Sequence, residues 1–204
     1  MPIYLYGTRV FDEPVHRITQ LNDRLTGLVR SMFETLVNGD GIGLAANQVG
    51  LPFSLFVMDL SGMSGHEGDK PLAVINPDIL SSSEVSVTME EGCLSIPGVR
   101  EDVGRPESII VRFTDGSFQE VQMELSGISA RVFQHEYDHL CQRFFVERLS
   151  SVKRQLVRPK LSRIRKGDVD TLYPVMTGKD ERQKKTGKFR NSSSGPKSNE
   201  RDRQ

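Results

Sequence analysis

Tryptophan is absent from this 204-residue chain, and cysteine and histidine are scarce, with two and four copies. Cys93 and Cys141 allow at most one bridge, which excludes the disulfide scaffolds of small secreted domains and predicts two reduced thiols. No apolar run approaches the ~18 residues that span a bilayer, and no basic stretch followed by an apolar one opens the chain. We therefore expect a soluble, cytoplasmic protein that does not interact with a membrane.

Net charge is also lacking, because 27 Lys and Arg balance 27 Asp and Glu. The balance hides a division: residues 1–150 hold 11 Lys/Arg against 21 Asp/Glu, whereas residues 151–204 hold 16 against 6. A basic C-terminal quarter on an acidic body is typical of an appendage that binds a polyanion, although a solubilising tail has the same composition. Both interpretations stay open.

The rest of the composition, with 36% hydrophobic residues, predicts one domain with a buried core. We place this domain at residues 1–176. Residues 177–204 contain one aromatic and no aliphatic side chain, which predicts a disordered basic tail.

Apolar spacing predicts both helices and strands within that domain. Amphipathic helices are expected over residues 20–37, 128–140 and 152–165, the last of them basic. Short β-prone runs bounded by turn residues predict antiparallel strands over 53–59, 72–75, 84–89, 109–114 and 118–125.

The pattern with the clearest chemistry is HEYDH, residues 135–139, in the second predicted helix. A four-residue step turns a side chain by ~400° around a helix, so His135 and His139 project from one face and can share a metal ion. Glu136 lies only ~60° from His139, which lets its carboxylate reach a metal-bound water. Glu136 is therefore the candidate general base.

A catalytic site of this kind needs a third protein ligand and an open position. No histidine follows His139, although Glu147 or a later acid remains possible. The better candidate is Cys93, because the glycine-containing segment Glu91–Ser95 follows a predicted strand and can aim a thiolate and free amides at one point. Cys141 points ~160° away from the metal face and is interpreted as structural.

A third segment, GIGLAANQ at Gly41–Gln48, is small and apolar except at its end. Its glycines allow a substrate backbone to approach closely, and Gln48 can donate an amide hydrogen bond to a developing oxyanion. Taken alone, this segment is equally typical of a turn followed by a buried stretch.

Together and in this order, the three segments resemble the peptide deformylase family, whose signature is GφGφAAxQ, then EGCLS, then HExDH. Every fixed position is matched, and the similarity to the bacterial type covers roughly residues 1–175. The resemblance implies a hydrolase that removes the N-formyl group from the N-terminal methionine of nascent polypeptides and releases formate. With it, the predicted fold is α+β: short antiparallel sheets surround a central metal-binding HExxH helix, with an N-terminal helix and a basic C-terminal helix.

The resemblance also implies a role for individual residues. The implied ligands of one divalent ion are Cys93, His135 and His139. The family characteristically uses Fe2+, with Zn2+, Ni2+ or Co2+ as alternatives. Glu136 would move the proton, while the Leu94 backbone N–H and the Gln48 side chain would hold the oxyanion.

The formyl-methionyl peptide is the substrate that the resemblance implies. It would lie as an added strand beside Ile42 and Gly43, with Arg100 on its far side. The methionine side chain needs an apolar pocket, for which Ile42, Ile128 and Val132 are the expected lining.

Two positions depart from the family pattern, which often has Gly where this chain has Gln142 and Asp where it has Glu147. Both positions follow the C-terminal end of the predicted metal-binding helix and lie outside the catalytic positions. An ion pair between Arg105 and Asp138 would fix that helix, unless the two form an ordinary surface pair.

Two other functions remain open. A zincin-like metallopeptidase would need a ligand downstream of His139 and would cleave internal amide bonds. A non-enzymatic, ribosome-associated module would use the ion only to brace its fold. The basic C-terminal region makes ribosome docking a secondary hypothesis for the enzyme as well, and a monomer is expected.

Overall fold

The computed structural model describes residues 1–180, and most of the tail predicted at 177–204 lies outside this range. The strands are β1 (Ile3–Tyr4), β2 (Gly43–Ala45), β3 (Leu55–Met58), β4 (Leu72–Ser82), β5 (Ser86–Cys93), β6 (Ile96–Pro106), β7 (Ser108–Thr114), β8 (Glu120–Ser126) and β9 (Val175–Met176). The α-helices are α1 (Asp23–Asn38), α2 (Gly127–Leu140) and α3 (Ser151–Lys166). Short 3-10 turns are η1 (Arg9–Asp12), η2 (Ala46–Val49) and η3 (Phe145–Arg148). The predicted α+β class with small antiparallel sheets is confirmed.

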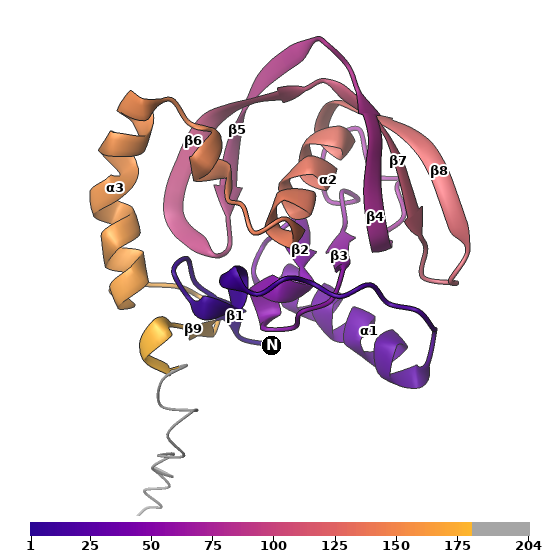
Figure 1. Ribbon diagram of the computed structural model, residues 1–204, viewed down its shortest axis with the longest axis horizontal. Helices are drawn as coiled ribbons and strands as arrows, with labels where there is room; N and C mark the ends of the chain where they lie inside the picture. Colours follow the sequence, from indigo (N-terminus) through magenta and orange to yellow (C-terminus); the bar gives the residue numbers. More distant parts are fainter. Residues whose placement is uncertain (181–204) are drawn as a thin grey trace, which may run out of the picture.

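The strands form three sheets within residues 1–180. Five strands pair antiparallel in the order β2-β3-β4-β7-β8, β5 pairs antiparallel with β6, and β1 pairs parallel with β9. The β5–β6 pair and the large sheet stand on opposite sides of α2, as Figure 1 shows. The helix that carries HEYDH therefore lies at the centre of the molecule.

Burial of α2 explains why its polar residues must find partners inside the protein. Ten of its fourteen residues are buried, although the helix is not apolar all round. Phe133 packs edge-to-face on Phe56 of β3, with ring centroids 4.9 Å apart, and this contact fixes the helix on the large sheet. On the other side of the helix, His135 and His139 meet Cys93 at the end of β5, and Asp138 pairs with Arg105 of β6.

The outer helices cover the rest of the core. Helix α1 packs Leu25, Met32 and Leu36 on the opposite face of the large sheet, and Asn22 caps its start by accepting from the Leu25 N–H at 2.9 Å. Helix α3 buries one apolar stripe, including Leu161, next to β6. All three predicted helices are confirmed, with ends that differ by no more than three residues.

Strand β6 is the main element that the sequence analysis does not predict. Two glycines and two prolines interrupt its eleven residues, which hides the strand pattern. Its alternation survives at Val99, Val103 and Arg105, whose side chains are buried while their neighbours are more exposed. The strand is stabilised by a long antiparallel register with β5, from Ser86↔Pro106 to Gly92↔Arg100.

Gln142, which stands where the family often has glycine, fits the turn at the C-terminal end of α2. Gln142 takes a left-handed φ of 61°, a conformation that glycine adopts at lower cost. The turn is nevertheless closed, because the N–H of Arg143 donates to the Asp138 carbonyl at 2.8 Å. The substitution thus leaves the helix end intact.

The end of the described chain, residues 177–180, forms a local turn. Thr177 donates its N–H and its hydroxyl to the Asp180 carboxylate, at 2.9 and 2.7 Å. The predicted boundary at residue 176 stays a prediction, because residues 181–204 lie outside the described part. None of the helices in residues 1–180 has the length and apolar character that crossing a bilayer requires.

Candidate metal centre

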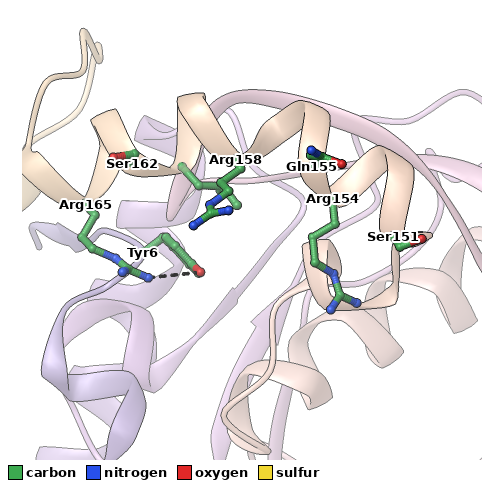
Figure 2. A pocket seen from close by; sticks show the side chains of 8 residues that line it. Tyr6, Ser151, Arg154, Gln155, Arg158, Ser162 and Arg165 are labelled. Carbon is green, nitrogen blue, oxygen red and sulfur yellow. Dashed lines mark hydrogen bonds between the residues drawn. The ribbon is translucent and has the colours of Figure 1, made fainter.

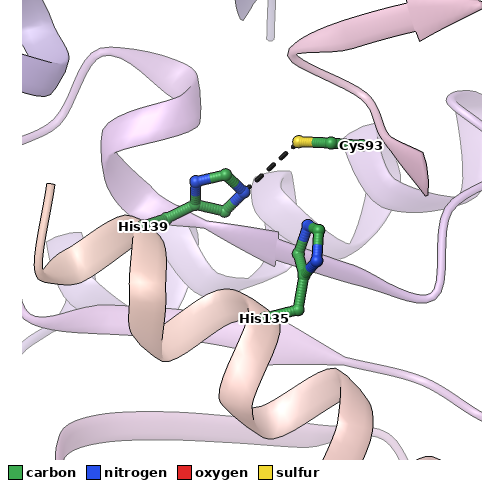
Figure 3. A group of neighbouring side chains, drawn as sticks. All are labelled: Cys93, His135 and His139. Carbon is green, nitrogen blue, oxygen red and sulfur yellow. Dashed lines mark hydrogen bonds between the residues drawn. The ribbon is translucent and has the colours of Figure 1, made fainter. Parts of the chain in front are cut away.

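Helix α2 and the end of β5 bring together three side chains that suit a metal ion. The ligand atoms of Cys93, His135 and His139 lie within 4.8 Å of one another, with 3.3 Å between the Cys93 sulfur and His139 Nε2. Both rings rise from α2 toward the sulfur, as Figure 3 shows. Within residues 1–180 this is the one such group. A thiolate and two imidazoles form a donor set that fits a divalent ion with a fourth position open.

Glu91 orients one of the two imidazoles. Its Oε2 accepts from His135 Nδ1 at 2.8 Å, which leaves Nε2 of that ring for the shared site. Burial raises the pKa of Glu91, but hydrogen bonds from Arg105 and His135 outweigh burial and lower it. Glu91 therefore stays a carboxylate. The role of Glu91 is not predicted from the sequence, although a residue two positions before Cys93 on a strand shares its face.

Arg105 extends this contact into a buried ionic network. Its Nε lies 2.6 Å from Glu91 Oε1 and its Nη1 lies 2.6 Å from Asp138 Oδ2, so the predicted pair with Asp138 is present and buried. Arg131 also binds Glu91, at 2.7 Å, and Arg148 holds both oxygens of Asp138 at 2.6 Å. The network joins the metal helix to β5, β6 and η3, and neither Arg131 nor Arg148 is predicted from the sequence.

The electrostatic environment favours a cation beside a neutral donor. Burial lowers the pKa of His135, but Cys93 and Glu91 outweigh it and raise the pKa to about 10. Burial, together with the neighbouring His135, holds the pKa of His139 well below its usual value. Binding of an ion would therefore displace the proton from His135, whereas His139 is already the uncharged imidazole that binds metals.

Glu136 lies buried against β2 with half of its carboxyl group free. It is 3% exposed, and its Oε2 has no hydrogen-bond partner among the described residues. Burial raises the pKa of Glu136 to about 7, which suits a group that accepts and returns a proton near neutrality. The close approach requires glycine at position 43, since a Cβ there would lie 2.5 Å from Glu136 Oε1.

Gln48 brings an amide group to the same place. Its Oε1 accepts from the Ala45 N–H at 2.7 Å, and its Nε2 donates to Ser95 Oγ at 3.2 Å and to Cys93 Sγ at 3.5 Å. Its side chain is buried and held at both ends, so the amide is pre-oriented next to the sulfur. The three motifs of the sequence therefore meet at one point.

Known proteins resemble this chain over most of its length. A family profile described as polypeptide deformylase matches residues 1–155. The peptide deformylase of Salinibacter ruber is 42% identical in an alignment 188 residues long, which covers 89% of this chain and 96% of that protein. The peptide deformylase of Chlorobium phaeovibrioides is 42% identical over 86% of this chain and 92% of its own. The chain belongs to the peptide deformylase family.

Solved structures of this enzyme family share the fold. Peptide deformylase 1B of Arabidopsis thaliana, in complex with an inhibitor, superposes with a TM-score of 0.76 at 33% identity, over 92% of this chain and 94% of that one. The Thermotoga maritima peptide deformylase gives a TM-score of 0.67 at 38% identity, over 72% and 96%. The chain is therefore an enzyme, which removes the non-enzymatic alternative.

The residues expected to bind the substrate lie on β2, α2 and β6 or next to β2. Ile42 and Ile128 are partly buried and pack on the apolar cluster that contains Val132. Gly43 lies on β2, an edge strand of the large sheet. Arg100 is exposed on β6, opposite Gly92 and 3.4 Å from Glu90.

Neither Cys141 nor Glu147 belongs to the ligand group. Cys141 stands outside the ligand group, as helix geometry predicts, and is an exposed free thiol at the C-cap of α2. Glu147 accepts from the Phe144 N–H at 3.1 Å and so closes η3. Its carboxylate serves this turn rather than the metal centre.

Proposed function

We propose that this enzyme removes the N-formyl group from the N-terminal methionine of nascent polypeptides and releases formate in a metal-dependent reaction. The observation that carries the proposal is the meeting of Cys93, His135 and His139 beside the free carboxyl oxygen of Glu136. These three side chains would hold one divalent ion, natively Fe2+ and alternatively Zn2+, Ni2+ or Co2+. When bound, it would polarise the formyl carbonyl and lower the pKa of a water molecule.

The chain's own groups supply the remaining steps. Glu136 takes the proton of the attacking water and returns it to the leaving amine, a role supported by its burial near His135. The Leu94 backbone N–H and the Gln48 side-chain amide stabilise the charge that develops on the formyl oxygen. The place of Gln48 Nε2, 3.5 Å from the Cys93 sulfur, supports this assignment.

The peptide is proposed to bind along β2. Since β2 is an edge strand, an extended chain can add to it beside Ile42 and Gly43 through main-chain hydrogen bonds. Ile42, Ile128 and Val132 would receive the methionine side chain, and their common apolar cluster supports this. Arg100 would stand on the far side of the peptide.

An anaerobic formate-release assay tests the proposal. The full chain, loaded separately with Fe2+, Zn2+, Ni2+ or Co2+, is given a formyl-methionyl peptide, with the N-acetyl-methionyl analogue as the matched control. Metal content is measured on each sample. We expect formate only from the formylated peptide and in proportion to bound metal. Absence of formate from a fully loaded, folded sample contradicts the function.

The zincin-like alternative is distinguished by the origin of the third ligand. It requires a ligand downstream of His139, whereas the third member of the described group is Cys93, far upstream. The same samples should leave the internal amide bonds of a blocked peptide intact. Cleavage of such bonds would favour the alternative.

We also propose that α3 docks the enzyme on the ribosome in the cytoplasm, where a monomer would meet its nascent substrates. Arg154, Arg158 and Arg165 line a groove beside Tyr6, and Figure 2 shows their guanidinium groups on the same side of the helix. Steps of four and seven residues place these arginines on one helical face. Exposed guanidinium groups in a row suit the phosphates of ribosomal RNA.

A further inference from the structure

The turn that follows Cys93 is held from outside by both ends of the described chain. The hydroxyl of Tyr173 donates to the Leu94 carbonyl at 2.8 Å. One residue later, the Ser95 carbonyl accepts from the Tyr6 backbone N–H, also at 2.8 Å. Two consecutive peptide groups next to a metal ligand therefore depend on segments remote in sequence.

Tyr173 is well anchored for this contact. It lies two residues before Val175, the first residue of β9, which pairs with Ile3 of β1. The N–H of Ile3 donates to the Pro174 carbonyl at 2.9 Å, so the residue after Tyr173 is tied to the N-terminal strand. The half-buried ring stays protonated, because burial and the nearby Cys93 raise the pKa of Tyr173 to about 12. It is a permanent donor at neutral pH.

We propose that Tyr173 is a positioning residue for deformylation, which orients the Leu94 peptide so that its N–H faces the developing oxyanion. The N–H and the carbonyl of Leu94 belong to neighbouring peptide planes, which are joined by the φ and ψ angles of Leu94. A hydrogen bond that fixes the Leu94 carbonyl therefore restricts the orientation of the Leu94 N–H. Without the Tyr173 hydroxyl, the turn after Cys93 loses the hydrogen bond that restrains the Leu94 carbonyl. The inference rests on the proposed function, since it assigns Tyr173 to that reaction.

The test is Tyr173→Phe in the full chain, which removes the hydroxyl and keeps the ring. Tyr4→Phe is the matched control, because the Tyr4 ring packs on Gly50 rather than on the turn. We expect kcat for a formyl-methionyl peptide to fall about tenfold to a hundredfold, as displaced catalytic donors typically cause. KM, metal content and the unfolding midpoint should match those of the unsubstituted protein, and Tyr4→Phe should be fully active.

A second measurement separates positioning from stability. Affinity for a peptide analogue with a tetrahedral, oxyanion-bearing centre should fall with kcat/KM, whereas affinity for the deformylated product should not change. The inference is overturned by Tyr173→Phe with unaltered kcat, by loss of activity in proportion to lost metal, or by an equal loss in Tyr4→Phe. Inactivity of the unsubstituted, metal-loaded protein would refute the proposed function itself, which separates the two failures.

Discussion

Helices α2 and α3 both carry many charged side chains, but these are buried on α2 and mostly exposed on α3. On α2 the charged groups are buried, and Arg131 and Asp138 are paired, as in the contact of Asp138 with Arg105 and Arg148. On α3 there are seven basic and no acidic residues, and most of them are exposed. An ion pair that is buried in the low-dielectric interior is rigid and fixes the geometry of the elements that it joins. Exposed charges instead attract distant partners of opposite charge, and salt screens this attraction. One helix therefore builds the site, and the other presents a charged surface.

The largest expected effect is at Glu136, the buried acid of α2 with a free oxygen. Glu136→Gln keeps the shape but cannot accept a proton, so we expect kcat to fall by about 10²- to 10⁴-fold. Metal content and unfolding midpoint should stay the same. Glu124→Gln, on the exposed face of β8, is the matched control and should be fully active. Full activity in Glu136→Gln would remove this residue as the base.

The next effect concerns the network that fixes α2. Arg105→Met leaves Glu91 and Asp138 buried with fewer partners, and we expect a loss of about 3–5 kcal/mol in the free energy of unfolding. Arg112→Met is the control, because Arg112 meets Asp78 at 3.4 Å on the surface and should cost less than about 1 kcal/mol. Urea denaturation of both variants measures the difference. Equal losses would contradict the distinction between buried and exposed pairs.

The smallest effect is expected on α3, where only docking should change. Arg154→Gln combined with Arg158→Gln should leave formate release and the unfolding midpoint unaltered. Cosedimentation with ribosomes should weaken, and the slope of log affinity against log salt should become shallower by roughly 1–2 units. Arg24→Gln with Arg30→Gln removes the same charge from exposed positions of α1. Ribosome binding that does not depend on salt concentration would contradict docking through α3. So would an equally large loss of binding in this control.

The sequence predicts what depends on local periodicity. The three helices follow from apolar spacing, and the shared face of His135 and His139 follows from the helical step. The sequence also predicts the pairing of Arg105 with Asp138, and the structure confirms it. The meeting of the three motifs comes from the resemblance rather than from spacing.

The rest depends on contacts that no local pattern encodes. Strand β6 is hidden by its glycines and prolines and exists because β5 pairs along it. Arg131 reaches Glu91 across 40 positions, and Tyr173 reaches Leu94 across 79. Only the strand register of β5 could have indicated Glu91, whose side chain shares a face with Cys93.

The central claim is that a sulfur from β5 and two imidazoles from α2 share one catalytic ion. The two cysteines provide the most direct test, through metal content and formate release of Cys93→Ala and Cys141→Ala prepared without oxygen. The account predicts one ion per chain and full activity in Cys141→Ala, with loss of both in a folded Cys93→Ala protein. A Cys93→Ala protein that keeps its ion and its activity would contradict it.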